Sequence, residues 1–409
     1  MTDIPKIRFR GFMDDWEQRK LGDVAITFEY GLNAAAKEFD GENKYIRITD
    51  IDDNSHEFII DDVTSPDTDL SEADNYKLSE GDILFARTGA SVGKTYIYKA
   101  SDGLVYYAGF LIRARIKGGH NAEFVFQNTL TDKYKKYISV TSQRSGQPGV
   151  NAQEYARYEF LVPSLEEQDK ISKYLRSLDN LITLHQHKCE ETKELKKYML
   201  QKMFPRNGRK NPEIRFAGFT DDWEQRKLGE LVEKYENPVE TPHDGYERLG
   251  IRSHAKGTFH SYVEAGKELE TARMHRVAAD KFIVNITFAW EHAVAITDDG
   301  DAGLLVSHRF PQFSFCENLS SHFFKYVMLD RRFREHLELS SPGGAGRNKV
   351  LKIDDMLKYI VRFPSIIEQT KVGEYFDNLD NLITLHQRKC EELKEVKKFM
   401  LQNMFPQKG

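Results

Sequence analysis

The sequence predicts an α+β fold: two α/β heads joined by two long antiparallel helices that form an intramolecular coiled coil, arranged as a pseudo-twofold internal repeat. The first observation is a repeated opening, because residues 7–24 (IRFRGFMDDWEQRKLGDV) recur as residues 214–231 (IRFAGFTDDWEQRKLGEL). The second is a repeated 42-residue segment at residues 164–205 and 365–406, in which LDNLITLHQ is unchanged. A repeat of such long period decides the architecture before any local pattern does.

The order of the copies predicts four parts. These are a first head at residues 1–163, a first helix at 164–205, a second head at 206–364 and a second helix at 365–409. The segments between the copies, about 25–163 and 232–364, hardly resemble each other. A length of 409 residues suits two domains better than one core. One framework therefore carries two different heads.

The composition is that of a folded globular protein, with 30% charged and 40% hydrophobic residues. No apolar run approaches the roughly 20 residues that cross a bilayer, and the N-terminus lacks the apolar core of a secretory signal. Cys189, Cys316 and Cys390 form neither a disulfide framework nor a zinc pattern, so we expect reduced thiols. We therefore expect a cytoplasmic location and no membrane partner.

The charge is unevenly distributed, although the net charge is only −5. Residues 38–82 hold 15 Asp/Glu against 3 Lys/Arg, whereas residues 83–163 hold 11 Lys/Arg against 5 Asp/Glu. A local positive surplus can bind phosphates on an acidic chain. The alternative is chance clustering on a solvated surface, and residues 285–363 balance at 10 and 10.

The repeated segments predict the two long helices through a heptad seam, whose spacing alternates between four and three. The seam residues are Ile171, Leu175, Leu178, Ile182, His185, Cys189 and Thr192 in the first copy, and Val372, Phe376, Leu379, Ile383, His386, Cys390 and Leu393 in the second. Prolines precede both segments and end them, which suits helix boundaries. A helix of about 39 residues spans roughly 58 Å. One apolar seam needs a partner, and the other copy is the simplest one.

His185 and His386 fall on this seam. A functional interpretation is metal binding or a pH switch. The alternative, which we favour, is a polar seam residue that fixes the register of the helices.

Within the first head, residues 77–98 (KLSEGDILFARTGASVGKTYIY) predict a turn, a strand, a glycine loop and a second strand. The loop is similar to a nucleotide-binding P-loop, but three residues instead of four separate Gly89 from Gly93, and a strand pattern follows instead of a helix. We predict that the loop presents donors to phosphates and base edges; the alternative is a hairpin without a ligand. The candidate residues are Arg87, Thr88, Ser91 and Lys94.

The second head has residues 280–299 (DKFIVNITFAWEHAVAITDD) at the comparable place, with Trp290 and His292 in the turn. Each head then ends on a Gly/Pro/polar loop, a short amphipathic piece and a strand. Donor-rich residues of these end loops complete the candidate contacts to base edges or phosphates: Arg144, Gln147 and Asn151 in the first head, and Arg347, Asn348 and Lys349 in the second. Ordinary turn chemistry is the alternative for each of them.

Several signatures of catalysis are missing. There is no Asn-Pro-Pro-aromatic motif or cofactor fingerprint of an adenine methyltransferase, no helical His-x-x-x-His pair and no Gly-x-Ser-x-Gly elbow. No carboxylate cluster with lysine indicates a nuclease. We therefore predict a recognition protein without a catalytic, cofactor-binding or metal site of its own.

Together these pieces resemble the specificity subunit of a type I restriction–modification system. The resemblance rests on the doubled IRFxGFxDDWEQRKLG opening, the GDILFARTGASVGKT loop, and the helix starts PSLEEQDKISKYLRSLDNLI and PSIIEQTKVGEYFDNLDNLI. It covers essentially the whole chain, although the second head lacks the glycine–lysine loop.

The resemblance implies that each head is a target recognition domain that reads one half of a bipartite, asymmetric site in double-stranded DNA. It implies that the helices set the unread gap and dock two methyltransferase subunits, and that restriction and translocase subunits join them. S-adenosylmethionine, ATP and Mg²⁺ would then belong to those partners, with no cofactor in this chain. The competing hypotheses are a coiled-coil scaffold that binds proteins through its heads, and a P-loop enzyme.

Overall fold

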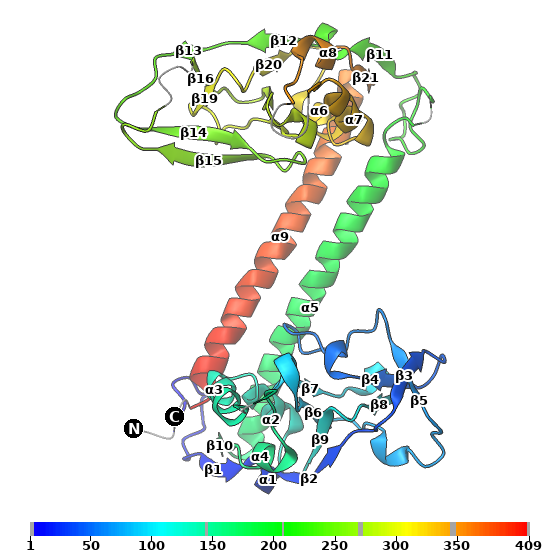
Figure 1. Cartoon of the computed structure of the whole chain (residues 1–409), viewed down its shortest axis with the longest axis vertical. Coiled ribbons are helices and arrows are strands. Elements are labelled where there is room, and N and C mark those ends of the chain that lie inside the picture. Colours follow the sequence, from blue (N-terminus) through cyan, green and yellow to red (C-terminus); the bar gives the residue numbers. More distant parts are fainter. Residues whose placement is uncertain (1–3, 144–145, 207, 269–272, 344–348, 407–409) are drawn as a thin grey trace. The chain divides into compact units, whose positions relative to one another are not determined.

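The computed structural model describes residues 4–143, 146–206, 208–268, 273–343 and 349–406. The chain forms two compact units: unit 1 holds residues 1–187 and 386–409, and unit 2 holds residues 188–385. Each unit therefore combines one head with part of each long helix (Figure 1). Three of the predicted contact residues, Arg144, Arg347 and Asn348, lie outside the described residues.

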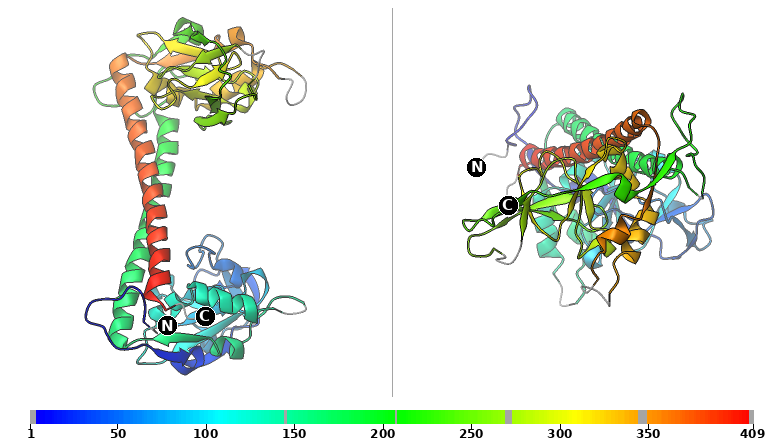
Figure 2. Two further views of the ribbon diagram at one scale, coloured as in Figure 1. Left: turned by 90° about the vertical axis from the view of Figure 1, so that its left-hand side faces the viewer. Right: turned by 90° about the horizontal axis from the view of Figure 1, so that it is seen from above.

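The long helices are α5 (Leu165–Lys202, 38 residues) and α9 (Ile366–Met404, 39 residues), which lie side by side within each unit (Figures 1 and 2). In unit 1, Asp179 Oδ1 of α5 lies 2.6 Å from Lys397 Nζ of α9. Further along α5, His185 lies against His386, which comes earlier in α9. The helices therefore run antiparallel, as the repeat predicts. No helix in the described part of the chain combines the length and apolar character that a bilayer crossing requires.

The predicted seam is the face on which the helices meet. Its buried members include Ile171, Leu175, Leu178, Ile182 and Cys189 on α5, and Val372, Phe376, Leu379 and Cys390 on α9. The Nδ1 atoms of His185 and His386 lie 3.0 Å apart, so a neutral pair can share one hydrogen bond across the seam. No group of three or more His, Cys, Asp or Glu residues that could hold a metal occurs among the described residues. All three cysteines are free thiols.

The head of unit 1 contains two four-stranded sheets and a two-stranded ribbon. The first sheet has the antiparallel order β2 (Ala25–Tyr30), β9 (Leu111–Ile116), β6 (Ile83–Ala86), β7 (Thr95–Ile97). The second has the order β3 (Ala35–Glu38), β5 (Thr64–Asp67), β4 (Lys44–Ile46), β8 (Val105–Tyr107), in which β4 and β8 are parallel. The ribbon pairs β1 (Glu17–Lys20) with β10 (Glu159–Val162). The helices are α1 (Leu21–Val24), α2 (Ala122–Asn128), α3 (Asp132–Thr141) and α4 (Ala152–Ala156), with short 3₁₀ turns η1 (Ile48–Asp50), η2 (Asp74–Tyr76), η3 (Gly89–Ser91) and η4 (Ala100–Asp102).

The head of unit 2 has the corresponding parts. Its first sheet has the order β12 (Val232–Tyr235), β20 (Gln312–Phe315), β17 (Phe282–Val284), β18 (Val294–Ile296). Its second sheet has the order β13 (Pro238–Val239), β16 (Met274–Arg276), β19 (Leu305–Ser307), β14 (Tyr246–Ile251), β15 (Thr258–Val263). The ribbon pairs β11 (Glu224–Lys227) with β21 (Ile360–Phe363). The helices are α6 (Ser321–Val327), α7 (Arg331–Leu339) and α8 (Ile353–Met356), with 3₁₀ turns η5 (Leu228–Glu230) and η6 (Ala289–Glu291).

The first sheets of the two heads therefore share one connectivity although their sequences hardly resemble each other. In unit 1 Phe85 of β6 lies opposite Ile112 of β9, and in unit 2 Phe282 of β17 lies opposite Phe313 of β20. All four residues are buried. What the heads share is a pattern of buried apolar residues, which many side chains satisfy.

The repeated openings attach each head to the helices. Arg8 binds Glu167 of α5 through two hydrogen bonds of 2.7 and 2.8 Å, and Arg215 binds Glu368 of α9 at the same two distances. The ring of Trp16 packs edge-on against Phe405, at the end of the second repeated segment. Residues 7–16 and 214–223, which precede β1 and β11, form no strand, and their apolar side chains pack as arms against the core of each unit.

Candidate nucleic-acid interface

Two loops of the first head, predicted separately as candidate contacts, lie against each other in unit 1. The loop after β6 and the loop before α4 are joined by a β-bridge between Thr88 and Gly149. The amide of Val150 also donates to the carbonyl of Arg87 at 2.9 Å. The exposed Gln147 therefore belongs to the same surface as Arg87 and Thr88.

The glycines of the first loop serve the turn itself. Gly89 and Gly93 have φ angles of +74° and +85°, and a Cβ on Gly93 would lie 2.5 Å from the Ile138 side chain. The amide of Gly93 donates to the Tyr155 hydroxyl, and its carbonyl accepts from the Tyr134 hydroxyl, both at 3.1 Å. The Gly93 backbone is thus fully engaged, and strand β7 follows instead of a helix. This geometry does not form a nucleotide-binding P-loop.

Arg87 is a charged residue of this surface that makes a cation–π contact. Its guanidinium lies over the Tyr30 ring, 5.0 Å from the ring centre, and the Tyr30 hydroxyl accepts from the Ala152 amide at 3.3 Å. Phe110 is 58% exposed, and its carbonyl accepts from the Arg87 amide, while Ser91 is half-buried. A supported guanidinium beside exposed aromatic rings and hydroxyls can serve phosphate or base-edge contacts.

Two other predicted residues of this head are already engaged within the protein. The Lys94 side chain is 10% exposed, and its ammonium donates to the Ile51 carbonyl at 2.9 Å and pairs with Asp53 at 2.5 Å. Asn151 caps α4 by accepting from the Glu154 amide at 3.0 Å. A DNA contact by Lys94 would have to break its ion pair, whereas Asn151 is exposed and its side-chain NH2 donates no hydrogen bond within the described part of the chain.

The second head brings its two candidate loops together in the same way. The amide of Leu351 donates to the carbonyl of Ile286 at 2.8 Å, which matches the bond between the two loops of unit 1. Trp290 is half-buried and its indole N–H donates to the Thr287 carbonyl at 3.2 Å. The ammonium of Lys349 lies over the Trp290 ring, 5.3 Å from the ring centre. Trp290 and Lys349 therefore form one aromatic–cation pair.

His292 lies beneath this loop instead of on its surface. It is 5% exposed, and its Nε2 donates to the Met328 carbonyl at 2.8 Å. Burial lowers the pKa of its imidazole, although the bond to Met328 opposes this shift. His292 has a left-handed backbone with φ of 62°, at the place in its loop that Gly93 occupies in the other head. The DNA contact predicted for His292 remains a prediction. In the structure the His292 side chain lies under the loop and supports it from below.

Exposed aromatic residues of both heads were not predicted from the sequence as candidate contacts. In unit 2, strand β15 carries Phe259 and Tyr262, which are 38% and 63% exposed, and the Arg252 guanidinium lies 5.4 Å from the centre of the Phe259 ring. In unit 1 the corresponding omissions are Tyr30 and Phe110, 44% and 58% exposed. An aromatic residue in a strand usually indicates core, so only its exposure identifies it as a candidate contact.

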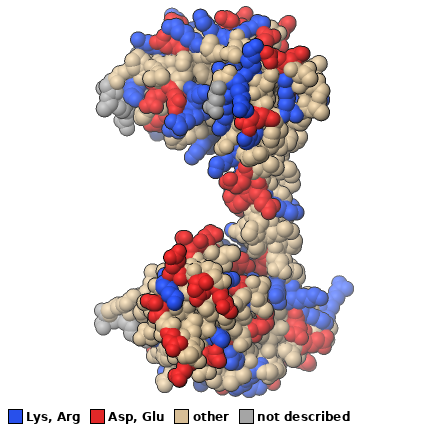
Figure 3. All heavy atoms as spheres, turned by 90° about the vertical axis from the view of Figure 1, so that its right-hand side faces the viewer, with Lys and Arg blue, Asp and Glu red and all other residues tan. Residues whose placement is uncertain are grey.

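The two heads differ in charge on the face that Figure 3 shows. Asp and Glu are frequent on the visible face of the first head, whereas Lys and Arg gather on the visible face of the second (Figure 3). A hollow of about 510 Å³ in unit 2 is lined by Lys234, Arg273, His275 and His308, and also by Glu236, which pairs with Lys234 at 2.5 Å. The balanced charge count in residues 285–363 did not predict this cluster of basic side chains, because part of it comes from earlier strands.

Comparisons with known proteins agree with this arrangement of doubled heads and helices. The family model described as "Type I restriction modification DNA specificity domain" matches residues 13–194 and 220–395. Two specificity subunits from Methanocaldococcus jannaschii, of the type I restriction enzyme MjaVIII and the putative type I restriction enzyme MjaX, are each 22% identical to the chain. Each alignment covers 94% of this chain and 91% of the relative.

The fold is also that of a solved relative. The crystal structure of the type I restriction–modification S subunit from M. genitalium matches with a TM-score of 0.63 and 11% sequence identity, over 99% of this chain and 100% of that one. The family model matches twice, once for each head with its helix, and together the two matches span most of the chain. The chain therefore belongs to the family of type I restriction–modification DNA specificity proteins, which recognise DNA and are not themselves enzymes.

Proposed function

We propose that this chain is the DNA-reading subunit of a type I restriction–modification complex, and that each head reads one half of a bipartite, asymmetric site. This proposal rests on one observation: the two heads share the arrangement of their strands and loops but differ in the side chains that the loops carry. Both heads have the same first-sheet order and the same bond between their two candidate loops. The side chains on those loops differ, so each head presents different chemistry to DNA.

The two candidate surfaces suit different half-sites. Arg87 and Gln147 offer donors that can bind guanine or adenine edges in the major groove. Trp290 and Lys349 offer an aromatic face and a single point charge instead. We propose these residues as principal contacts, with Thr88, Ser91 and Asn151 beside them. Lys94 and His292 would then act mainly by holding their loops.

The outer faces of the long helices support the docking of two copies of one partner. Exposed apolar residues recur at matching positions of the repeat: Leu181, Leu184, Leu195 and Tyr198 on α5, and Leu382, Leu385, Val396 and Phe399 on α9. Each is between 40% and 54% exposed. An unpaired apolar stripe on a soluble helix commonly marks an interaction site. We propose that these two stripes receive two methyltransferase subunits, which restriction and translocase subunits then join.

In this proposal the partners carry the chemistry. S-adenosylmethionine belongs to the methyltransferase subunits, and ATP and Mg²⁺ belong to the translocase. This chain supplies sequence recognition and the spacing between half-sites. Because the complex acts on cellular and incoming DNA, the proposal assigns the chain to the cytoplasm.

Methylome sequencing tests the proposal. The chain is expressed with its cognate methyltransferase in a host that lacks other methylation. A single bipartite methylated motif is expected, and replacing residues 25–163 with another head should change one half of this motif only. An assembled complex without any methylated motif would support the scaffold hypothesis, and a change in both halves would contradict modular reading.

A further inference from the structure

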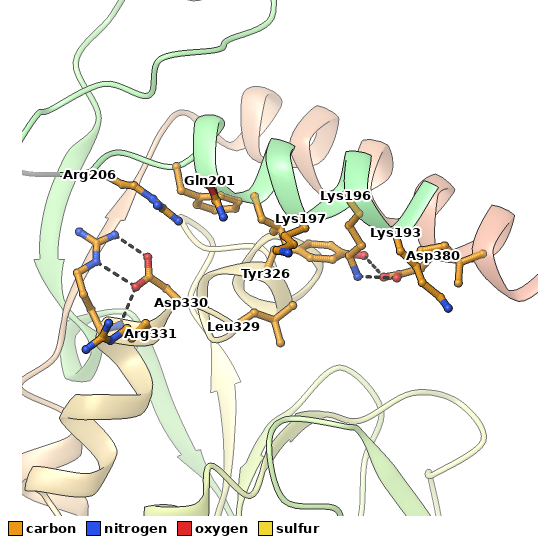
Figure 4. Close-up of a pocket in the computed structure, with 14 residues that line it drawn as sticks. Lys193, Lys196, Lys197, Gln201, Arg206, Tyr326, Leu329, Asp330, Arg331 and Asp380 are labelled. Carbon is orange, nitrogen blue, oxygen red and sulfur yellow. Dashed lines mark hydrogen bonds and ion pairs between the residues drawn. The ribbon is translucent and has the colours of Figure 1, made fainter. Parts of the chain in front are cut away.

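Two pockets, one in each unit, are built from the same repeated residues. The pocket of unit 2 (Figure 4) has a volume of about 690 Å³ and lies where the C-terminal part of α5 faces the turn between α6 and α7. The pocket of unit 1 has a volume of about 300 Å³ and lies where the C-terminal part of α9 faces the start of α3. Lys193, Lys196 and Lys197 line the first, and their repeat equivalents Lys394, Lys397 and Lys398 line the second.

The apolar floor of the pockets is repeated as well. Leu200 and Ile383 line the pocket of unit 2, and Leu401 and Ile182 line that of unit 1. In the repeat, Leu200 corresponds to Leu401 and Ile182 to Ile383. The remaining wall comes from each head and differs between the units. The sequence thus preserves one wall of each pocket while the heads diverge.

One lysine of each trio is held in place within the wall. Lys196 pairs with Asp380 at 2.5 Å, and Lys397 pairs with Asp179 at 2.6 Å. The Lys196 ammonium also lies 5.3 Å from the centre of the Tyr326 ring. Figure 4 shows Lys196, Tyr326 and Asp380 together on one side of the pocket. These paired lysines shape the wall and are not available to a ligand.

Lys193 also pairs with a carboxylate of its own helix, that of Glu190 at 2.7 Å, so the cationic rim above the apolar floor consists of Lys197 in unit 2 and of Lys394 and Lys398 in unit 1. The Lys197 side chain is 68% exposed, and its carboxylate partner on the same helix lies 3.7 Å away. Lys398 is exposed, and within the described part of the chain no carboxylate lies within ion-pair distance of it. Six Lys or Arg residues line the pocket of unit 2 against two carboxylates, although Arg331 and Arg332 pair with Glu335 and Asp330, and four line the pocket of unit 1 against three. The rim therefore favours an anionic ligand.

We propose that each pocket binds the same acidic, amphipathic segment of the methyltransferase partner, so that one chain captures two copies of that segment. This inference rests on the proposed function. The cationic rim would bind the carboxylates, and the floor would bury the apolar side chains of the segment. Duplex DNA fits less well, because phosphates offer no apolar group for the floor. Because the helix wall of the pocket is repeated, the chain can bind two identical segments although its two heads read different DNA.

Charge reversal at the rim tests this proposal in the full chain. Lys197→Glu changes the pocket of unit 2, and Lys398→Glu changes that of unit 1. Lys170→Glu and Lys371→Glu are matched controls, because these lysines are repeat equivalents on the same helices and lie outside both pockets. Circular dichroism establishes that every variant is folded, and Lys197→Gln provides a milder change at the same position.

The readouts are native mass spectrometry and titration calorimetry with the purified methyltransferase subunit. Two bound copies are expected for the chain without substitutions and for both controls. Each single variant should weaken one of the two binding events about tenfold, and the double variant should weaken both. Lys197→Gln should have a smaller effect. Added salt should weaken binding to the unchanged chain more than to the double variant.

Three outcomes separate failure of the pockets from failure of the proposed function. If the unchanged chain binds no methyltransferase subunit, the proposed function itself is in error. If the double variant binds two copies with unchanged affinity, the pocket proposal is overturned while the proposed function stands. If stoichiometry is unchanged but the assembled complex loses affinity for duplex DNA, the pockets contact phosphates, and the proposal is likewise overturned.

Discussion

Removal of Arg8 should destabilise unit 1 strongly, because it leaves a buried carboxylate without its partner. The Arg8 and Glu167 side chains are 11% and 1% exposed, and two hydrogen bonds of 2.7 and 2.8 Å join them. Hydrogen bonding to Glu167 raises the pKa of Arg8, so the guanidinium stays charged across the accessible pH range. Breaking a buried pair of this kind costs about 3–5 kcal/mol. Arg8→Leu should therefore lower the free energy of unfolding of unit 1 by that amount.

The repeat supplies a matched set of variants for this measurement. Arg215→Leu breaks the equivalent pair with Glu368 and should act on unit 2 alone. Arg19→Leu is the control, since Arg19 pairs with Glu17 on the surface with 50% and 69% of the two side chains exposed, and such a pair contributes less than about 1 kcal/mol.

Urea denaturation combined with hydrogen exchange is the appropriate assay, because two compact units need not unfold together. Arg8→Leu should reduce amide protection in β1 and β10 while protection in β11 and β21 remains. The double variant Arg8→Leu/Glu167→Leu should recover much of the loss, because it removes both charges. The reasoning is refuted if Arg8→Leu costs no more than Arg19→Leu, or if the double variant is less stable than Arg8→Leu.

Other predictions concern DNA reading, spacing and pH. Arg87→Ala should reduce the discrimination between bases in one half of the methylated motif by about 1–3 kcal/mol. Trp290→Ala should change only the other half. Methylome sequencing measures both effects, and a change in both halves for either variant contradicts this division. Adding one helical turn of about 5.4 Å to both α5 and α9 should lengthen the unread gap by about one or two base pairs, and an unchanged gap would argue against a spacer role. The pKa of His292 is lowered in the folded state, so the unfolded chain takes up a proton first as the pH falls. Unit 2 should therefore lose stability below about pH 6.5, as measured by urea midpoints or hydrogen exchange, and His292→Asn, which tolerates the left-handed backbone, should reduce this loss.

Secondary structure could be predicted from the sequence where one pattern of apolar residues dominated. The 4-3 spacing of the seam predicted both long helices, since a stripe of that period can only be buried between helices. Residues 77–98 correctly predicted strand, glycine loop and strand, which are β6, η3 and β7. The second loop lacks the glycines of the first. The sequence did not predict that His292 adopts there the left-handed backbone conformation that Gly93 has in the first loop. In the structure, the buried His292 side chain is held by a bond to the Met328 carbonyl, which lies outside the loop, and no pattern within the loop encodes such a contact.

The sequence by itself determined the division into a constant frame and two unlike heads, the helices with their seam, and the family to which the chain belongs. These conclusions rest on repetition and periodicity, which are properties of the order of residues. The tertiary structure alone decided which loops meet, that Lys94 turns inward to Asp53, and that Tyr30 supports Arg87. It also brought the repeated lysines into two equivalent pockets. Such contacts join residues far apart in the chain, and their geometry depends on how whole elements pack, so no local pattern encodes them.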